Sequence, residues 1–205
     1  MNPAETTVLI VVPPGTRRPG ALGRALDQHC PDWQQRWVWA GDPTAHPKSL
    51  SVGDRHNVDR WWTEVDAPRQ IDLISVESDA VPWLVVLTAA RPLMQQGVNI
   101  VVMVAGHLAV LGDIGAIEPK SADDVIVVPH RIGPLDDDGL APSLDDLESD
   151  GAFSTSVLAL GSDRVDVIDW LIARLFDEQP GELGRTFDLL PIWFGARACT
   201  EPSVG

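Results

Sequence analysis

The chain contains little cysteine and no tyrosine. Among its 205 residues there are only two cysteines, Cys30 and Cys199, which lie far apart and form no CxxC pair. This spacing excludes a disulfide framework and a zinc site built from paired cysteines. So few cysteines are typical of a reducing compartment, and we expect a cytoplasmic protein.

Basic residues and long apolar runs are also scarce. Fifteen lysines and arginines stand against thirty acidic residues, which gives a net charge of −15. This balance opposes the phosphate contacts on which nucleic-acid affinity depends, so no nucleic-acid partner is expected. No stretch approaches the roughly 20 apolar residues that cross a bilayer, and no basic region precedes the short N-terminal apolar run. We therefore expect a soluble protein without a transmembrane segment.

What the chain does contain is an alternation of short apolar runs and helix-like segments. Apolar runs without polar alternation are typical of strands buried on both faces of a sheet, and helical spacing predicts the covering helices. This pattern predicts one α/β domain over 1–205, a three-layer sandwich with a mainly parallel mixed sheet, a loop or flap at 43–69 and a flexible tail at 196–205. Strands are predicted at 7–12, 36–40, 71–76, 100–104, 125–128 and 156–160, and helices at 21–29, 82–96 and 165–175.

Several motifs follow one another along this framework. The segment ALGRALDQHCPDWQQRWVWAGD has a helix, an HxPD turn and a strand that ends at Asp42, and TAARP follows at 88–92. Farther on, Pro129-His130 is followed by GPLDDDGLAPSLDDLESDGAFSTSVLAL and then by DVIDWLIARL. This series resembles the bacterial nucleotide-diphospho-sugar glycosyltransferases of the GT-A fold. The resemblance implies that fold and a nucleotide-diphosphate sugar as donor.

The chain departs from this family at functional positions. After the strand NIVVMV the family carries an Asp-x-Asp pair that holds a divalent metal, whereas this chain has Ala105-Gly106-His107. Ser154 stands where asparagine is expected, and Arg91 stands where lysine is usual. A histidine nitrogen is a softer ligand than a carboxylate and suits manganese better than magnesium. His107 is therefore the candidate metal ligand, with Mn²⁺ as the candidate ion, and a solvated histidine at a strand end is the alternative.

The resemblance also implies donor contacts at Asp42, Arg91, His107, His130 and Ser154. A guanidinium matches phosphate oxygens in a bidentate manner, which favours Arg91 as a diphosphate ligand. His130 follows a buried strand, where α/β folds place ligand-binding residues, although an ordered loop anchor fits the position equally well.

The candidate general base is Asp150. In inverting transferases a carboxylate deprotonates the acceptor hydroxyl, and Asp150 stands directly before Gly151 at a suitable position. An aspartate beside a glycine is also typical of turns, so a purely structural role remains open.

These residues support three hypotheses. The first is a glycosyltransferase with a degenerate metal site. The alternative is a non-catalytic GT-A-like pseudoenzyme that serves as a binding or regulatory partner, with a protein partner or a second copy of the chain as its target. The third is an α/β domain that resembles the family by composition alone.

Overall fold

The computed structural model describes most of the predicted framework. The predicted strand at 71–76 and the loop at 43–69 lie outside the described residues. Those described are residues 5–13, 20–39, 81–105, 108, 110, 112–130, 151–177 and 183–199.

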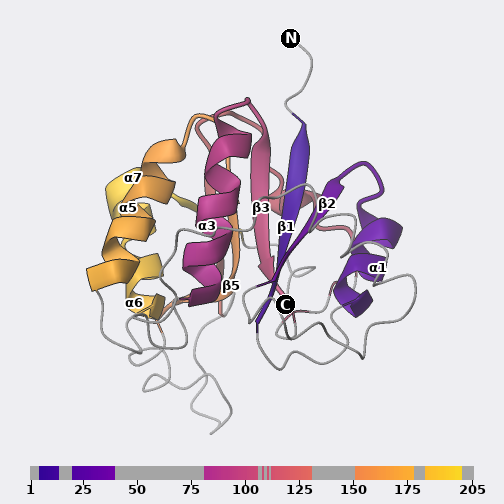
Figure 1. Ribbon diagram of the computed structural model, residues 1–205, viewed down its shortest axis with the longest axis horizontal. Helices are drawn as coiled ribbons and strands as arrows, with labels where there is room; N and C mark the ends of the chain where they lie inside the picture. The colour runs from indigo at the N-terminus through magenta and orange to yellow at the C-terminus, as the bar shows by residue number, and fades with distance from the viewer. Residues whose placement is uncertain are drawn as a thin grey trace, which may run out of the picture.

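The described strands form one six-stranded mixed sheet (Figure 1). Its order is β2-β1-β3-β5-β4-β6, and β1 pairs in parallel with both β2 and β3. β5 is antiparallel to β3 and to β4, so it runs opposite to the other described strands. The strands are β1 (Thr6–Val12), β2 (Gln34–Trp39), β3 (Asn99–Val104), β4 (Val125–Pro129), β5 (Phe153–Leu160) and β6 (Arg197–Ala198).

The central strands are apolar because the sheet is buried on both faces. Every residue of β1 and β3 is buried. Alternate side chains of β1 enter different clusters, since Leu9 and Val11 belong to one and Val8 and Ile10 belong to the other. A strand with one solvent-exposed face would instead alternate apolar and polar residues.

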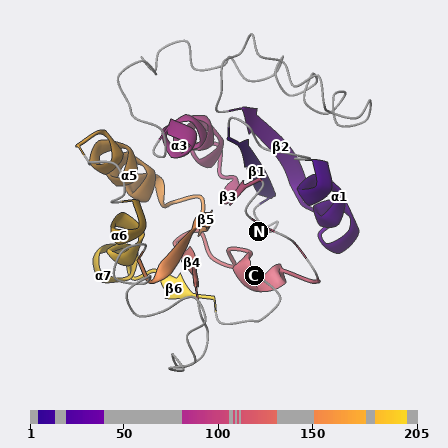
Figure 2. The same cartoon turned by 90° about the horizontal axis from the view of Figure 1, so that it is seen from below.

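Helices cover both faces of the sheet (Figure 2). The cluster on one face includes apolar residues of α1 (Gly20–His29) and of the single-turn helix η2 (Gly115–Ile117). The cluster on the other face includes residues of α3 (Val81–Met94), α5 (Val165–Asp177), α6 (Leu183–Asp188) and α7 (Leu190–Phe194). The predicted α/β class is therefore confirmed. None of the described helices has the length and apolar character needed to cross a membrane.

The C-terminal part of the described chain differs most from the prediction. Helices α6 and α7 were not predicted, although Phe187 and Leu190 recur at helical spacing and both are buried. Arg197 and Ala198 lie in the range predicted as a flexible tail, but they form β6 and pair with Ile126 and Val127 of β4. A strand of two residues is too short to show a periodic pattern in the sequence, so β6 could not be predicted from it.

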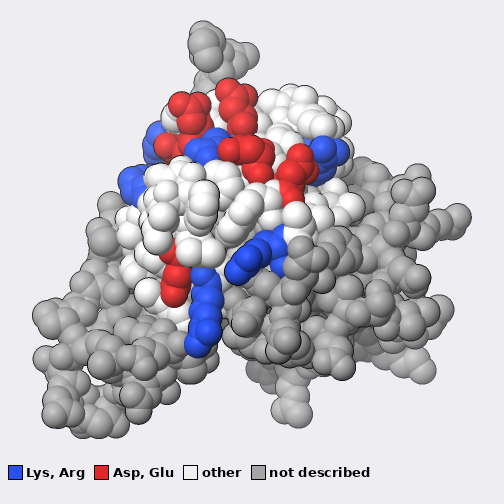
Figure 3. Space-filling view, turned by 90° about the vertical axis from the view of Figure 1, so that its left-hand side faces the viewer, with Lys and Arg blue, Asp and Glu red and all other residues white. Residues whose placement is uncertain are grey.

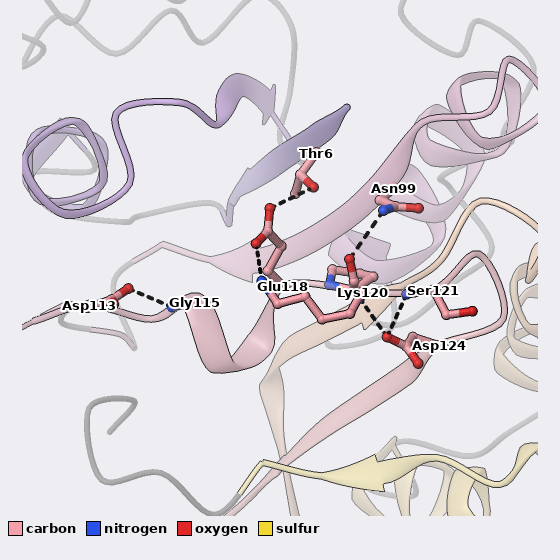
Figure 4. Close-up of polar contacts among 9 residues, drawn as sticks. Thr6, Asn99, Asp113, Gly115, Glu118, Lys120, Ser121 and Asp124 are labelled. Atoms are coloured by element: carbon pink, nitrogen blue, oxygen red, sulfur yellow. Dashed lines mark hydrogen bonds and ion pairs between the residues drawn. The ribbon is translucent and has the colours of Figure 1, made fainter. Parts of the chain in front are cut away.

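A polar network closes the end of the sheet where β1 and β3 begin (Figure 4). Asn99 is only 4% exposed, and its side chain bonds two distant backbone segments. Its Nδ2 donates to the carbonyl oxygen of Pro119 at 3.3 Å, and its Oδ1 accepts from the N–H of Ser162 at 3.0 Å. These bonds tie the start of β3 to the segment before β4 and to the turn before α5.

A tight contact with α6 fixes the opposite end of β5. Gly151 has a φ of +88°, and a Cβ there would lie 2.7 Å from the backbone of Gly184 in α6. The next N–H, that of Ala152, donates to Oδ1 of Asp188 at 2.8 Å. Glycine at 151 is required both by its left-handed backbone and by the close approach of α6.

We predict that Asn99→Leu lowers the free energy of unfolding by about 2–4 kcal/mol. The substitution leaves the Pro119 carbonyl and the Ser162 N–H buried without their partner, and each such group costs about 1–3 kcal/mol. Urea unfolding followed by circular dichroism measures the change. Gln96→Leu, at an exposed position of the preceding turn, is the matched control and should change stability by less than about 0.5 kcal/mol. Equal stability of both variants would contradict the role of Asn99.

A second prediction separates backbone strain from close packing. Gly97 has a φ of +84° with nothing within 4 Å of a Cβ built on it, whereas the Cβ at Gly151 meets Gly184. Gly97→Ala should therefore cost only the strain of the left-handed backbone, about 1–2 kcal/mol. Gly151→Ala should cost about 1–3 kcal/mol more, because the backbone of α6 has to shift. Equal losses in urea unfolding would show that α6 does not pack as described.

Candidate functional site

The candidate site lies at the edge of the sheet where the parallel strands end. β1, β2, β3 and β4 finish at this edge and β5 begins there, as the pairs Val12↔Trp39, Val11↔Val104 and Pro129↔Phe153 show. The chain places β2 on one side of β1 and β3 on the other. A reversal of strand order at the carboxyl ends of parallel strands is where α/β sheets bind ligands.

The structure describes three of the predicted donor-binding residues. His130 follows β4 directly and Ser154 is the second residue of β5, so both belong to the carboxyl edge. Arg91 belongs to α3 and lies elsewhere. The other predicted residues, Asp42, His107 and Asp150, lie outside the described residues.

His130 is anchored at this edge by its backbone. Its N–H donates to the carbonyl oxygen of Ala152 at 3.0 Å, while its side chain is exposed. The anchoring role considered from the sequence is thus fulfilled by the main chain. The exposed imidazole is left in a position where a ligand at the carboxyl edge can reach it.

A large register shift in the pairing of β4 with β5, called the bulge below, shapes the start of β5. Val127 pairs with Leu158 and Pro129 pairs with Phe153, so a single β4 residue faces four β5 residues, 154 to 157. Such irregularities bend a strand and redirect its side chains, and they are common beside active sites. Here the bulge turns residues 153 to 156 into a partly exposed stretch, whereas 157 to 160 are buried.

Side chains satisfy backbone groups inside this bulge. The Oγ of Ser154 accepts from the N–H of Ser156 at 3.2 Å, and the carbonyl oxygen of Thr155 accepts from Nε1 of Trp83 at 2.9 Å. Because a bulge removes ladder partners, such substitutes keep backbone groups from being buried unpaired. A serine hydroxyl that accepts one bond still has a proton to donate, so Ser154 can also bind a ligand oxygen.

Trp83 connects the bulge to α6. Its indole ring packs edge-to-face against Phe187, with ring centroids 5.0 Å apart and an interplanar angle of 68°. Trp83 is 2% exposed and Phe187 is fully buried. The start of β5 is therefore held from two sides, by α3 through Trp83 and by α6 through Asp188. The sequence around β5 carries no sign of this support, because the supporting residues lie 72 and 36 positions away along the chain.

Arg91 lies away from the carboxyl edge. It stands eight residues after Trp83 in α3, or about 12 Å farther along the helix axis. Its guanidinium makes bonds of 2.8 and 3.2 Å to both carboxylate oxygens of Asp169 in α5. That hydrogen bond and the charge of Asp169 raise the pKa of Arg91. The structure therefore does not bring Arg91 together with His130 and Ser154.

The described residues do not fit a conventional metal site. Ala105 directly follows β3, has a fully buried methyl group and supplies no ligand atom. The carboxylate of Asp113, the nearest described acid along the chain, accepts a hydrogen bond from the N–H of Gly115 at 2.8 Å, so the backbone at the start of η2 occupies one of its oxygens. In the part of the chain that the structure describes, no three histidine, cysteine or acidic side chains gather closely enough to hold a metal ion.

Thiol chemistry is also disfavoured. Cys30 and Cys199 are free and buried in the described structure. Burial is the main cause that raises the pKa of the Cys30 thiol; a backbone hydrogen bond with Ile114 lowers it, and the charges of Asp113 and Glu118 raise it further. A buried thiol with a raised pKa is a poor nucleophile. What the described edge offers is hydrogen bonding to a ligand.

Relatives provide no further guide to this site. Comparisons with protein-family models, with curated proteins and with solved structures each found no match to this chain. The resemblance to GT-A glycosyltransferases therefore depends on the sequence motifs alone.

Proposed function

We propose that the chain is a GT-A-like protein that binds a nucleotide-diphosphate sugar at the carboxyl edge of its sheet. The observation that carries this proposal is the reversal of strand order at β1 between β2 and β3, with His130 and Ser154 at the same edge. Three-layer α/β/α architecture is part of the proposal and is supported by helices on both faces of the sheet.

The proposed binding uses uncharged hydrogen-bonding groups and an imidazole. The hydroxyl of Ser154 donates to a phosphate or sugar oxygen, and the exposed ring of His130 supplies a second donor. Hydrogen bonds to a charged group contribute more than neutral ones, about 1.5–3 kcal/mol each. The bulge and its contacts with Trp83 and Asp188 keep Ser154 in place before a ligand arrives, which reduces the entropy lost on binding.

Sugar transfer is the activity proposed for this site, with Asp150 as the base that deprotonates the acceptor. Asp150 precedes Gly151, whose position is fixed by α6. A carboxylate in that role has to lie within hydrogen-bond reach of the acceptor hydroxyl. Cations that neutralise the departing diphosphate lower the barrier of such a transfer. His107 is the proposed contributor of a metal contact.

The end of β3 favours a second candidate, a pseudoenzyme that binds the donor without transferring the sugar. Ala105 occupies the place of a metal-binding aspartate, and its side chain is fully buried. Arg91 offers no substitute cation, since it pairs with Asp169 on another part of the surface. Binding and transfer are therefore separate questions for experiment.

We predict that titration calorimetry detects binding of a UDP-, GDP- or dTDP-sugar, and that Ser154→Ala and His130→Ala each weaken it about tenfold or more. The expected loss follows from removing one hydrogen bond to a charged ligand. Matched controls lie at the opposite edge of the sheet: Ser121→Ala, after η2, and His29→Ala, at the end of α1, should leave affinity unchanged.

The outcomes distinguish the two candidates. Release of the nucleotide diphosphate with manganese present, lost in Asp150→Asn, would identify a transferase; binding without release would identify the pseudoenzyme. If none of the donors binds, with or without manganese, the proposed function is wrong. If the control variants weaken binding as much as Ser154→Ala, the site does not lie at the carboxyl edge.

A further inference from the structure

Residues 154 to 156 of β5 form what we call the unpaired segment. In the part of the chain that the structure describes, they have no register partner in β3 or in β4. The pairing of β5 with β3 stops at Val157, and its pairing with β4 passes from Leu158 to Phe153. The position of the Ser154 hydroxyl therefore depends on contacts other than the strand pairs of the sheet.

Trp83 ties the unpaired segment to α3. Its Nε1–H donates to the carbonyl oxygen of Thr155, the residue directly after Ser154, at 2.9 Å. The bond from the N–H of Ser156 to Oγ of Ser154, at 3.2 Å, lies within the segment itself. The indole thus fixes the backbone of the segment relative to α3, and this backbone carries the Ser154 hydroxyl.

The direction of the indole N–H is itself fixed by packing. Trp83 is 2% exposed, and its ring packs edge-to-face on the fully buried ring of Phe187, with centroids 5.0 Å apart. A close-packed interior leaves a side chain of this size little room to change rotamer. The donor to Thr155 is therefore in place before any ligand arrives.

We propose that Trp83 is a positioning residue of the ligand site, which acts through Thr155 on the hydroxyl of Ser154. This inference rests on the proposed function, in which Ser154 donates to the ligand. Because Trp83 is buried, it acts through the Thr155 carbonyl and makes no contact with the ligand. Its bond restricts the unpaired segment in the free protein, so less conformational entropy is lost when the ligand binds.

Titration calorimetry of the full-length Trp83→Phe variant with UDP-, GDP- and dTDP-sugars tests the inference. A phenylalanine ring keeps an aromatic contact with Phe187 and lacks the N–H, so the Thr155 carbonyl loses its donor. We expect the dissociation constant of the donor that the wild-type protein binds to rise about fivefold or more.

Trp170 provides a matched control. It packs edge-to-face on Phe194 with centroids 5.3 Å apart and an interplanar angle of 70°, close to the 5.0 Å and 68° of Trp83 and Phe187. Trp170 belongs to α5, on the side of the molecule that faces the viewer in Figure 3, and this helix begins after β5 has ended at the opposite edge of the sheet. Trp170→Phe makes the same chemical change and should leave donor affinity unchanged.

Two further measurements separate positioning from a general loss of stability. In a Ser154→Ala background, Trp83→Phe should change the dissociation constant by less than about twofold, because the hydroxyl that the indole positions is gone. Without ligand, the N–H of Ser156 should exchange its hydrogen faster in Trp83→Phe and at the wild-type rate in Trp170→Phe, since only the first variant frees the unpaired segment.

The outcomes distinguish this inference from the proposed function. A wild-type protein that binds none of the donors would overturn both. Wild-type binding with an unchanged affinity of Trp83→Phe, or an equal loss in the presence and absence of the Ser154 hydroxyl, would overturn this inference alone. If circular dichroism shows that Trp83→Phe does not fold, Phe187→Leu replaces it: this variant keeps the N–H, removes the ring that orients it, and should weaken binding only when Ser154 is present.

Discussion

The burial of β1 and β3 beside one another is the constraint on which the rest of the structure depends. Both strands are buried along their whole length, and their side chains enter the clusters on both faces of the sheet. A strand without a polar face needs helices on each side of the sheet. The positions of α1 on one face and of α3 and α5 on the other follow from this requirement.

The two edges of the sheet then have different roles. Where β1 and β3 begin, side chains such as Asn99 and Asp124 accept and donate bonds to short connections and close the structure. Where the strands end, the described residues hold the start of β5 through the close approach of Gly151 to α6, the bond from Ala152 to Asp188 and the bond from Trp83 to Thr155. Hydrogen-bonding side chains such as those of His130 and Ser154 are partly or fully exposed at this second edge. Stabilising polar contacts of the described residues are thus concentrated at the first edge, and the second edge is the one at which we propose that a ligand binds.

The position of the Arg91 side chain is set by a contact between two helices. Its sequence context suggested a diphosphate ligand, but α5 places Asp169 within 2.8 Å of its guanidinium. Both side chains are about half exposed, and an ion pair of that kind contributes little to stability. Its consequence is positional: the pair holds Arg91 on the outer surface between α3 and α5, away from the carboxyl edge. The proposed site therefore relies on hydroxyl and imidazole groups.

The amino-acid sequence by itself determined the α/β class and most of the buried strands. Uninterrupted apolar runs such as 100–104 are typical of strands inside a covered sheet, and helical spacing identified α5, in which Ile168 and Leu175 are buried as predicted. These features are local, because each follows from the side chains of a single segment. The candidate position of His130 at a strand end was also readable in this way, whereas Ser154 was singled out through the family resemblance and lay outside the strand predicted at 156–160.

Only the tertiary structure decided how these segments meet. The antiparallel insertion of β5 between β3 and β4, the bulge around Thr155 and the pairing of Arg197 with Ile126 depend on hydrogen bonds between distant residues. Backbone groups are alike in every residue, so the sequence of a strand does not specify which neighbour they will bond. The close approach of the Gly151 and Gly184 backbones could not be predicted from the sequence either, because it is set by the packing of α6 on the assembled sheet.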